Sequence, residues 1–267
     1  MIENNDCLLV EQKDYVCTLM LNRPEKRNSL SPELLIKLTE TLETLSRDDN
    51  TRTVIIRGSG DKAFCAGYDI GKLTFDNSED NGQMTDRSNP FETAMAAIIN
   101  FPYPVIAMVN GYTFGGGCDL VASCDIRVGA DDIKLGMVPA KLGVVYSVEG
   151  LKRFVRAVGF SNAKDLFFTG ATFGAEKLKE IGLLNYLVPR AELESFTQNL
   201  AREISSNAPL SLKGTKRSLN MLADALQISE AAYQESGDLV RESFRSRDFK
   251  EAQAAFFEKR APHFEGR

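Results

Sequence analysis

The sequence predicts an α/β protein in which strand, glycine loop and helix recur, followed by a helical C-terminal part. Apolar strand-like runs that end in glycine lie several tens of residues apart, at "TVIIRGSG" and "PVIAMVNG", and a further strand-like run begins at Asp125. Such repeats favour parallel strands with their loops on a common edge over a hairpin-rich sandwich. From about Ala191 onward the pattern is wholly helical. We therefore expect a core over residues 1–190 and a helical region over residues 191–267.

The first elements expected from the N-terminus are two strands and a helix. "CLLVEQKDY" and "VCTLMLNRP" are apolar with partial alternation, which predicts strands on either side of a turn at residues 13–14. Ser31 is a suitable N-cap, and Pro32 suits the first helical position of the segment that follows. The leucines of that segment form one apolar stripe: Leu34, Leu35, Leu38, Leu42 and Leu45.

The later segments predict one surface loop and a succession of helices. Residues 71–90 are polar and rich in turn-forming residues, which is typical of a surface loop and only occasionally of a lid. The expected C-terminal helices are "AELESFTQNLAREISSN", "LSLKGTKRSLNMLADAL", "SEAAYQESGDLVRESF" and "RDFKEAQAAFFEKRA". Their apolar stripes include Phe244, Phe249, Phe256 and Phe257. These stripes either form an oligomer contact or pack on the core.

The composition predicts a soluble globular protein of the cytoplasm. Lys and Arg number 32 against 37 for Asp and Glu, so the net charge of -5 offers no basic excess for nucleic acid or an anionic membrane. The five cysteines are odd in number, share no CxxC spacing and mostly lie in apolar segments, as reduced thiols do. The N-terminus shows neither a secretory nor a transit signal, and no apolar run approaches the roughly 18 residues of a membrane span.

The chain contains a single histidine, His263, close to its C-terminal end. Serine and cysteine hydrolases, HExxH metalloproteases and multi-histidine metal sites all need a central imidazole. We therefore expect no metal site, and chemistry that depends on carboxylates, hydroxyls or backbone groups.

Three consecutive glycines precede a predicted helix in "GYTFGGGCDLVASCD", residues 111–125. They match neither phosphate-binding pattern, because Gly117-Cys118 replaces the Lys and Ser/Thr of a P-loop and Leu120 replaces the third glycine of the dinucleotide fingerprint. Glycines at a helix N-terminus can instead expose unpaired backbone N–H groups to a ligand atom. A second loop, residues 61–70, would add another donor and complete an oxyanion hole. The alternative is a tight turn that needs glycine for close strand packing.

Four stretches together resemble the crotonase (enoyl-CoA hydratase/isomerase) superfamily in order and spacing. They are "NRPEKRNSLS" at 22–31, "KAFCAGYDI" at 62–70, "PVIAMVNGYTFGGGCDL" at 104–120 and "FFEKRAPHFEG" at 256–266. The resemblance covers essentially the whole chain. It implies a crotonase-like spiral of repeated ββα units, a C-terminal helical trimerisation region, and a homo-oligomer that is a trimer or a dimer of trimers.

The resemblance also implies how an acyl-CoA substrate binds. The thioester carbonyl would lie between the N–H groups of Tyr68 and Gly116. The residues expected to contact coenzyme A are Ala66, Asp69 and Ile70 on the adenine and pantetheine side, and Lys26 or Arg27 and Lys259, of this or a neighbouring subunit, at the phosphates. A few such cations suffice for charge-assisted bonds despite the net acidity. Coenzyme A enters as part of the substrate, so no separate cofactor is expected.

The residues around the thioester restrict the reaction. Hydratases of the family manage water and the α-carbon proton with two glutamates. Here Asp119 stands at the first of these positions, and Pro139, which cannot ionise, stands at the second. Glu149 lies ten residues beyond Pro139 at a helix start, where a favourable first-turn charge explains it. Loss of CO2 from a malonyl-type thioester needs only an oxyanion hole and a pocket that orients the carboxylate.

The run "GMVPAKLGVVYSVEGLKRFVRAVGF" is most similar to the methylmalonyl-CoA decarboxylase branch of the family. In that branch a tyrosine at the position of Tyr146 is placed to hydrogen-bond the departing carboxylate, and an acid at the position of Asp119 lies near the reacting centre. The branch usually has Glu at 119 and His at 68, where this chain has Asp119 and Tyr68. We expect an acyl-CoA lyase that acts through an enolate. The alternatives are an enoyl-CoA hydratase or isomerase that uses Asp119 with Glu149 or a water, and a non-catalytic acyl-CoA-binding protein.

Overall fold

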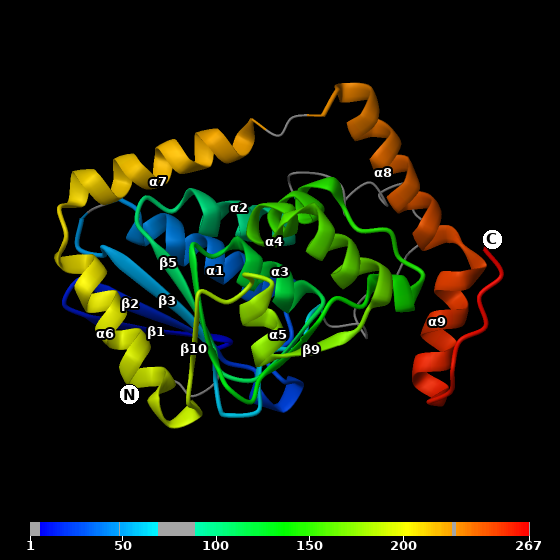
Figure 1. The fold of residues 1–267 in the computed structure, drawn as a ribbon, viewed down its shortest axis with the longest axis horizontal. Helices are drawn as coiled ribbons and strands as arrows, with labels where there is room; N and C mark the ends of the chain where they lie inside the picture. Colours follow the sequence, from blue (N-terminus) through cyan, green and yellow to red (C-terminus); the bar gives the residue numbers. More distant parts are fainter. Residues whose placement is uncertain (1–5, 48, 69–88, 226–227, 267) are drawn as a thin grey trace.

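The computed structural model describes residues 6–47, 49–68, 89–225 and 228–266, and within these ranges the chain forms two sheets (Figure 1). The larger sheet has the strand order β1-β2-β3-β5-β7-β10, and only its β1–β2 pair is antiparallel. Its strands are β1 (Leu8–Lys13), β2 (Val16–Leu21), β3 (Thr53–Gly58), β5 (Val105–Val109), β7 (Ile126–Ala130) and β10 (Tyr186–Val188). These parallel strands with helical connections confirm the predicted α/β class.

The smaller sheet has the order β4-β6-β8-β9, in which β4, β6 and β8 run parallel and β9 is antiparallel to β8. Its strands are β4 (Ala63–Cys65), β6 (Tyr112–Phe114), β8 (Lys134–Gly136) and β9 (Thr172–Gly174). Because β4 and β6 are parallel neighbours, the two glycine-containing loops that follow them leave the sheet at the same edge.

The helices of the described ranges surround the two sheets. They are α1 (Pro32–Leu45), α2 (Pro90–Asn100), α3 (Gly116–Ser123), α4 (Val148–Thr169), α5 (Ala175–Glu180), α6 (Leu193–Ser206), α7 (Pro209–Asp224), α8 (Glu230–Arg245) and α9 (Arg247–Glu258). Helix α6 packs on β3, β5 and β7, while α2 contacts both α1 and α3, and α3 contacts α4. None of the helices in these ranges is both long and apolar enough to cross a membrane.

Helix α1 forms as its sequence predicts. The Ser31 hydroxyl accepts a hydrogen bond from the Leu34 amide at 3.3 Å, and Pro32 occupies the first turn, where its missing N–H has no helical partner. The expected leucine stripe faces inward, with Leu34, Leu35, Leu38 and Leu42 all buried. Burial of such a stripe against the sheet is the main stabilising contribution of an amphipathic helix.

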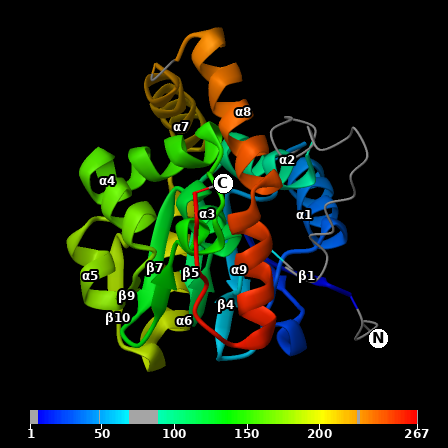
Figure 2. The same ribbon diagram turned by 90° about the vertical axis from the view of Figure 1, so that its right-hand side faces the viewer.

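The C-terminal part is helical, as expected, and reaches back over the core. Figure 2 shows α7 and α8 rising above the rest of the molecule before the chain turns down into α9. Helix α8 contacts α4, and α9 packs on the short 3-10 helix Pro139–Leu142. The tail thereby comes close to the loops of the smaller sheet. The predicted surface loop at 71–90 lies, up to residue 88, outside the described residues.

Candidate active site

The two glycine loops predicted to form an oxyanion hole meet in the structure. Tyr68 follows β4 and forms an isolated bridge with Leu30, whose N–H donates to the Gly67 carbonyl at 2.8 Å. A Cβ atom built on Gly67 would lie 2.7 Å from the Phe114 oxygen and 3.4 Å from the Gly116 nitrogen. Gly67 also has a φ of 96°, in the region that only glycine adopts readily. The approach of the loops therefore requires glycine at 67.

Each of the three consecutive glycines has its own role at the start of α3. Gly115 has a φ of 51°, and its carbonyl accepts from the Cys118 and Asp119 amides at 2.9 and 3.3 Å, so the helix begins there. Gly117 packs closely against β4. A Cβ atom there would lie only 2.5 Å from the Cys65 oxygen, so this position requires glycine. Gly116 stands at the first helical position, where the backbone N–H has no intrahelical acceptor.

The amides of Tyr68 and Gly116 are available to a ligand. Among the described residues, no protein group accepts a hydrogen bond from either N–H. The α3 N-terminus adds the positive end of the helix dipole at Gly116. Both residues line one cavity of about 130 Å³. Its described lining consists of Tyr68, Asn89, Phe91, Glu92, Gly116, Val144, Val145, Tyr146, Ser147, Val240 and Phe244. We call this the acyl cavity.

A second, larger cavity adjoins the acyl cavity at Tyr68, which lines both. It measures about 610 Å³, and three of the residues predicted to contact coenzyme A line it: Lys26, Arg27 and Ala66. Two further cations, Lys141 and Arg260, also line it and were missed from the sequence. Arg260, and not its neighbour Lys259, stands in the lining. Asp69 and Ile70 lie outside the described residues.

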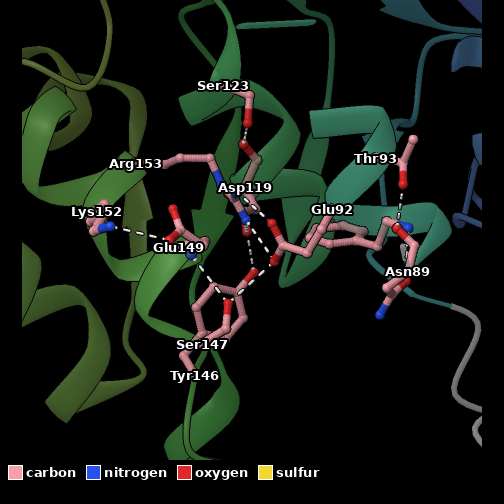
Figure 3. A network of polar contacts seen from close by, with 12 residues as sticks. Asn89, Glu92, Thr93, Asp119, Ser123, Tyr146, Ser147, Glu149, Lys152 and Arg153 are labelled. Carbon is pink, nitrogen blue, oxygen red and sulfur yellow. Dashed lines mark hydrogen bonds and ion pairs between the residues drawn. The ribbon is translucent and has the colours of Figure 1, made fainter. Parts of the chain in front are cut away.

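Asp119 lies behind the acyl cavity, completely buried and held by three donors (Figure 3). The Arg153 Nε and Nη2 atoms donate to its two oxygens at 2.5 and 2.9 Å. The Tyr146 hydroxyl donates to Oδ2 at 2.6 Å. Burial, together with the Asp119 charge, raises the pKa of Tyr146 well above its ordinary value, so its hydroxyl keeps the proton that it donates.

Arg153 also binds a second carboxylate, that of Glu92 on α2. Its Nη1 and Nη2 atoms donate to the Glu92 oxygens at 2.8 and 3.1 Å, and the Ser147 hydroxyl donates to the same carboxylate at 3.3 Å. Burial alone would lower the pKa of Arg153, but Asp119 and Glu92 outweigh it and raise the pKa above its usual value. The guanidinium therefore remains charged between two anions, the arrangement that a buried cation requires.

Gly150 is a further residue of the site that sequence reasoning missed. It lies in the first turn of α4, where its amide donates to the Ser147 hydroxyl at 3.1 Å. A Cβ there would lie 2.2 Å from Tyr146 Cε1 and 3.2 Å from Asp119 Oδ2. The Tyr146 ring fits against α4 only because residue 150 has no side chain. Glu149 lies in the first turn of α4, as expected, pairs with Lys152 at 3.1 Å and is not among the described residues that line the acyl cavity.

Pro139 stands where hydratases of the family carry their second glutamate, so no ionisable side chain is available at this position. Pro139 is buried and opens the 3-10 helix Pro139–Leu142 beneath α9. Within the described lining, the only carboxylic acid of the acyl cavity is Glu92. The described lining thus combines two residues whose amides have no acceptor among the described residues, the side chains of Tyr68 and Tyr146, and one carboxylate that is already paired.

A ββα arrangement with two glycine loops that meet at one cavity is that of the crotonases. The chain belongs to the enoyl-CoA hydratase/isomerase family, whose sequence profile matches residues 11–267. It is 32% identical over 252 residues to the methylmalonyl-CoA decarboxylase of Escherichia coli, which covers 94% of this chain and 95% of that protein. It is 31% identical over 255 residues to the short-chain-enoyl-CoA hydratase of Clostridium acetobutylicum, covering 95% of each.

A solved structure of methylmalonyl-CoA decarboxylase complexed with 2S-carboxypropyl-CoA superposes on this chain with a TM-score of 0.91 and 32% identity. The match covers 98% of this chain and 99% of the other. The chain is therefore a crotonase-superfamily acyl-CoA enzyme, while its relatives include both decarboxylases and hydratases at similar identity.

Proposed function

We propose that this enzyme decarboxylates methylmalonyl-CoA or a related malonyl-type thioester. One observation carries the proposal: Asp119 is buried in an ion pair with Arg153 and is not among the described residues that line the acyl cavity, whereas Tyr68, Gly116 and Tyr146 are. An acid locked in this way is poorly placed to exchange protons with a substrate. Decarboxylation needs no general base, and the groups that do face the cavity are those it uses.

The proposed step moves one electron pair. The bond between the α-carbon and the carboxylate carbon breaks, CO2 leaves, and the pair passes into the thioester to form an enolate. The Tyr68 and Gly116 amides would stabilise the charge that develops on the thioester oxygen. A proton from water then converts the enolate into the product acyl-CoA.

Tyr146 would hydrogen-bond the substrate carboxylate and orient it for departure. In this structure the hydroxyl proton is directed at Asp119. If the hydroxyl rotates and donates to the substrate instead, Asp119 loses this hydrogen bond but keeps two charge-assisted bonds from Arg153. The buried carboxylate therefore still has partners. Asp119 is thus a positioning residue in this proposal, because it acts on the substrate through Tyr146.

Coenzyme A would occupy the larger cavity. Its phosphates would pair with Lys26 or Arg27 and with Lys141, since these cations share that lining. Arg260 lies in the same lining but is already paired with Glu251 and Glu258. Ala66, which has a small side chain, leaves room for pantetheine on the way to Tyr68.

Hydration of an enoyl-CoA is a second candidate, and Glu92 favours it, because this carboxylate does line the acyl cavity. Two features count against it. Both Glu92 oxygens already accept from Arg153, and the described lining holds no second acid to share the proton transfers.

The test is a paired assay of the purified protein with methylmalonyl-CoA and with crotonyl-CoA, in which the thioester products are identified by mass. Formation of propionyl-CoA with crotonyl-CoA unchanged supports decarboxylation. Addition of water to crotonyl-CoA without CO2 release establishes the hydratase instead. Stabilisation of the fold by propionyl-CoA with no turnover of either substrate would leave a non-catalytic acyl-CoA-binding protein.

A further inference from the structure

Resting on the proposed decarboxylation, we infer that Glu92 is a specificity-determining residue whose negative charge faces the substrate carboxylate, so that it weakens binding of that carboxylate and promotes its loss as CO2. Nothing in the sequence of α2 singles this residue out. Its role follows from the cavity that it lines and from the charges around it.

Glu92 reaches the acyl cavity from the first turn of α2. The Asn89 side chain caps that turn by accepting from the Phe91 amide at 2.8 Å, which fixes the backbone that carries Glu92. The Glu92 side chain is only 13% exposed, and it lines the cavity together with Gly116 and Tyr146. A carboxylate bound beside Tyr146 would therefore share a cavity of about 130 Å³ with the carboxylate of Glu92.

The charges at and behind the cavity do not cancel. Asp119 and Glu92 are two anions, and one cation, Arg153, bridges them, which leaves one negative charge in excess. Among the described residues that line the acyl cavity, none is a lysine or an arginine. Because the Glu92 side chain is only 13% exposed, its charge is screened less than a surface charge, so the excess acts on an anion that enters the cavity.

This excess charge has unequal effects along the reaction. The bound substrate carries its negative charge on the carboxylate, close to Glu92. In the transition state the charge moves toward the thioester oxygen, where the Tyr68 and Gly116 amides stabilise it. Glu92 therefore raises the energy of the bound substrate more than that of the transition state. An interaction of this kind increases both kcat and KM.

The first experiment measures binding of two probes that differ only in the carboxylate, 2-carboxypropyl-CoA and propyl-CoA. Their ratio of dissociation constants is compared in the wild type, in Glu92→Gln and in Glu149→Gln. Glu149 is the matched control, because it is a neighbouring acid paired with Lys152 that does not line the acyl cavity. We expect Glu92→Gln to improve the relative affinity for the carboxylated probe about 10-fold and Glu149→Gln to leave it unchanged. If the relative affinity for the carboxylated probe in Glu92→Gln equals or falls below that of the wild type, the inference is wrong.

The second experiment measures steady-state turnover of methylmalonyl-CoA by the same variants and by Glu92→Asp. Glu92→Gln should lower KM and kcat together, by about 10-fold each, whereas Glu92→Asp keeps the charge and should retain much of the wild-type kcat. A fall in kcat with KM unchanged, in Gln and Asp alike, would show a purely structural role.

The two proposals fail separately. If the wild type forms no propionyl-CoA, the proposed function is wrong, and the probe affinities still report whether Glu92 disfavours a carboxylate. If the wild type decarboxylates but the probe ratio does not respond to Glu92→Gln, only the role of Glu92 is wrong.

Discussion

At the scale of single residues, the site depends on contacts that only particular side chains permit. Tyr146 packs against Phe167 with ring centroids 5.2 Å apart, and its hydroxyl reaches Asp119. The ring position and the hydroxyl bond are separate features, and each can be removed without the other. Two substitutions therefore test how the residue contributes.

Tyr146→Phe removes the hydroxyl and keeps the ring. We expect the protein to fold normally, since Asp119 retains both bonds from Arg153. Decarboxylation should fall about 10- to 100-fold in kcat, as expected for the loss of one hydrogen bond to a charged group. The rate of propionyl-CoA formation measures this, with Tyr112→Phe as a control on an exposed tyrosine. Wild-type kcat in Tyr146→Phe would remove this residue from the mechanism.

Gly150→Ala tests the ring position. The new Cβ would meet Tyr146 Cε1 at 2.2 Å, so the ring must move away from Asp119. Displacement of a catalytic group by about 1 Å costs roughly 100-fold in rate, so we expect a loss of that size in kcat with propionyl-CoA binding retained. Gly214→Ala is the control, because nothing lies within 4 Å of its Cβ position on α7. Equal activity of the two variants would contradict the argument.

The sequence revealed those residues of the site that local patterns mark. Gly115, Gly116 and Gly117 are recognisable because a glycine run before a helix has few uses, and Tyr68 and Tyr146 because their neighbourhoods resemble the family's. Arg153 and Glu92 have no local signature. They pair across 61 positions of the chain, and Arg153 meets Asp119 across 34, so only the packing of α2, α3 and α4 brings them together.

At the scale of elements, helix α7 contains a buried lysine, Lys216, that hydrogen-bonds to the core. The Lys216 ammonium donates to Asp125 at 2.6 Å and to the carbonyls of Tyr103 and Ile98 at 3.0 and 3.4 Å. Its side chain is 7% exposed. Periodicity predicted that this segment is helical, but it could not predict that a lysine would be the buried residue of α7, because lysine is normally a surface residue.

Lys216→Met should therefore destabilise the fold by about 3 kcal/mol, since it leaves Asp125 and two carbonyls without their cation in a largely buried site. Chemical denaturation measures the free energy of unfolding. Lys213→Met, one turn earlier on α7, is the control. Its pair with Asp49 is solvent-exposed and should contribute less than about 1 kcal/mol. Equal losses in both variants would mean that burial of Lys216 does not matter.

At the scale of the whole molecule, the C-terminal helices leave apolar side chains uncovered. On α7, Leu210 is 81% exposed, Leu219 60% and Leu222 73%. Phe256 and Phe257 on α9 are exposed as well, whereas Phe249 is buried and packs against Phe244 of α8 with ring centroids 5.2 Å apart. The Phe stripes noted in the sequence thus divide between packing of α9 against α8 and an open surface. Exposed apolar patches of this kind mark protein interfaces.

The expected trimer or dimer of trimers would cover these side chains, and the introduction of negative charge on the apolar face of α7 tests it. Leu219→Glu with Leu222→Glu places two carboxylates one turn apart on the uncovered face, where an interface would have to bury them. We expect sedimentation to show an oligomer for the wild type and a smaller species for the double variant. Arg217→Glu, an exposed charged position on the same helix, should leave the oligomer intact. A wild type that sediments as a single chain at micromolar concentration would contradict the expected assembly, and the apolar face of α7 would then need another partner.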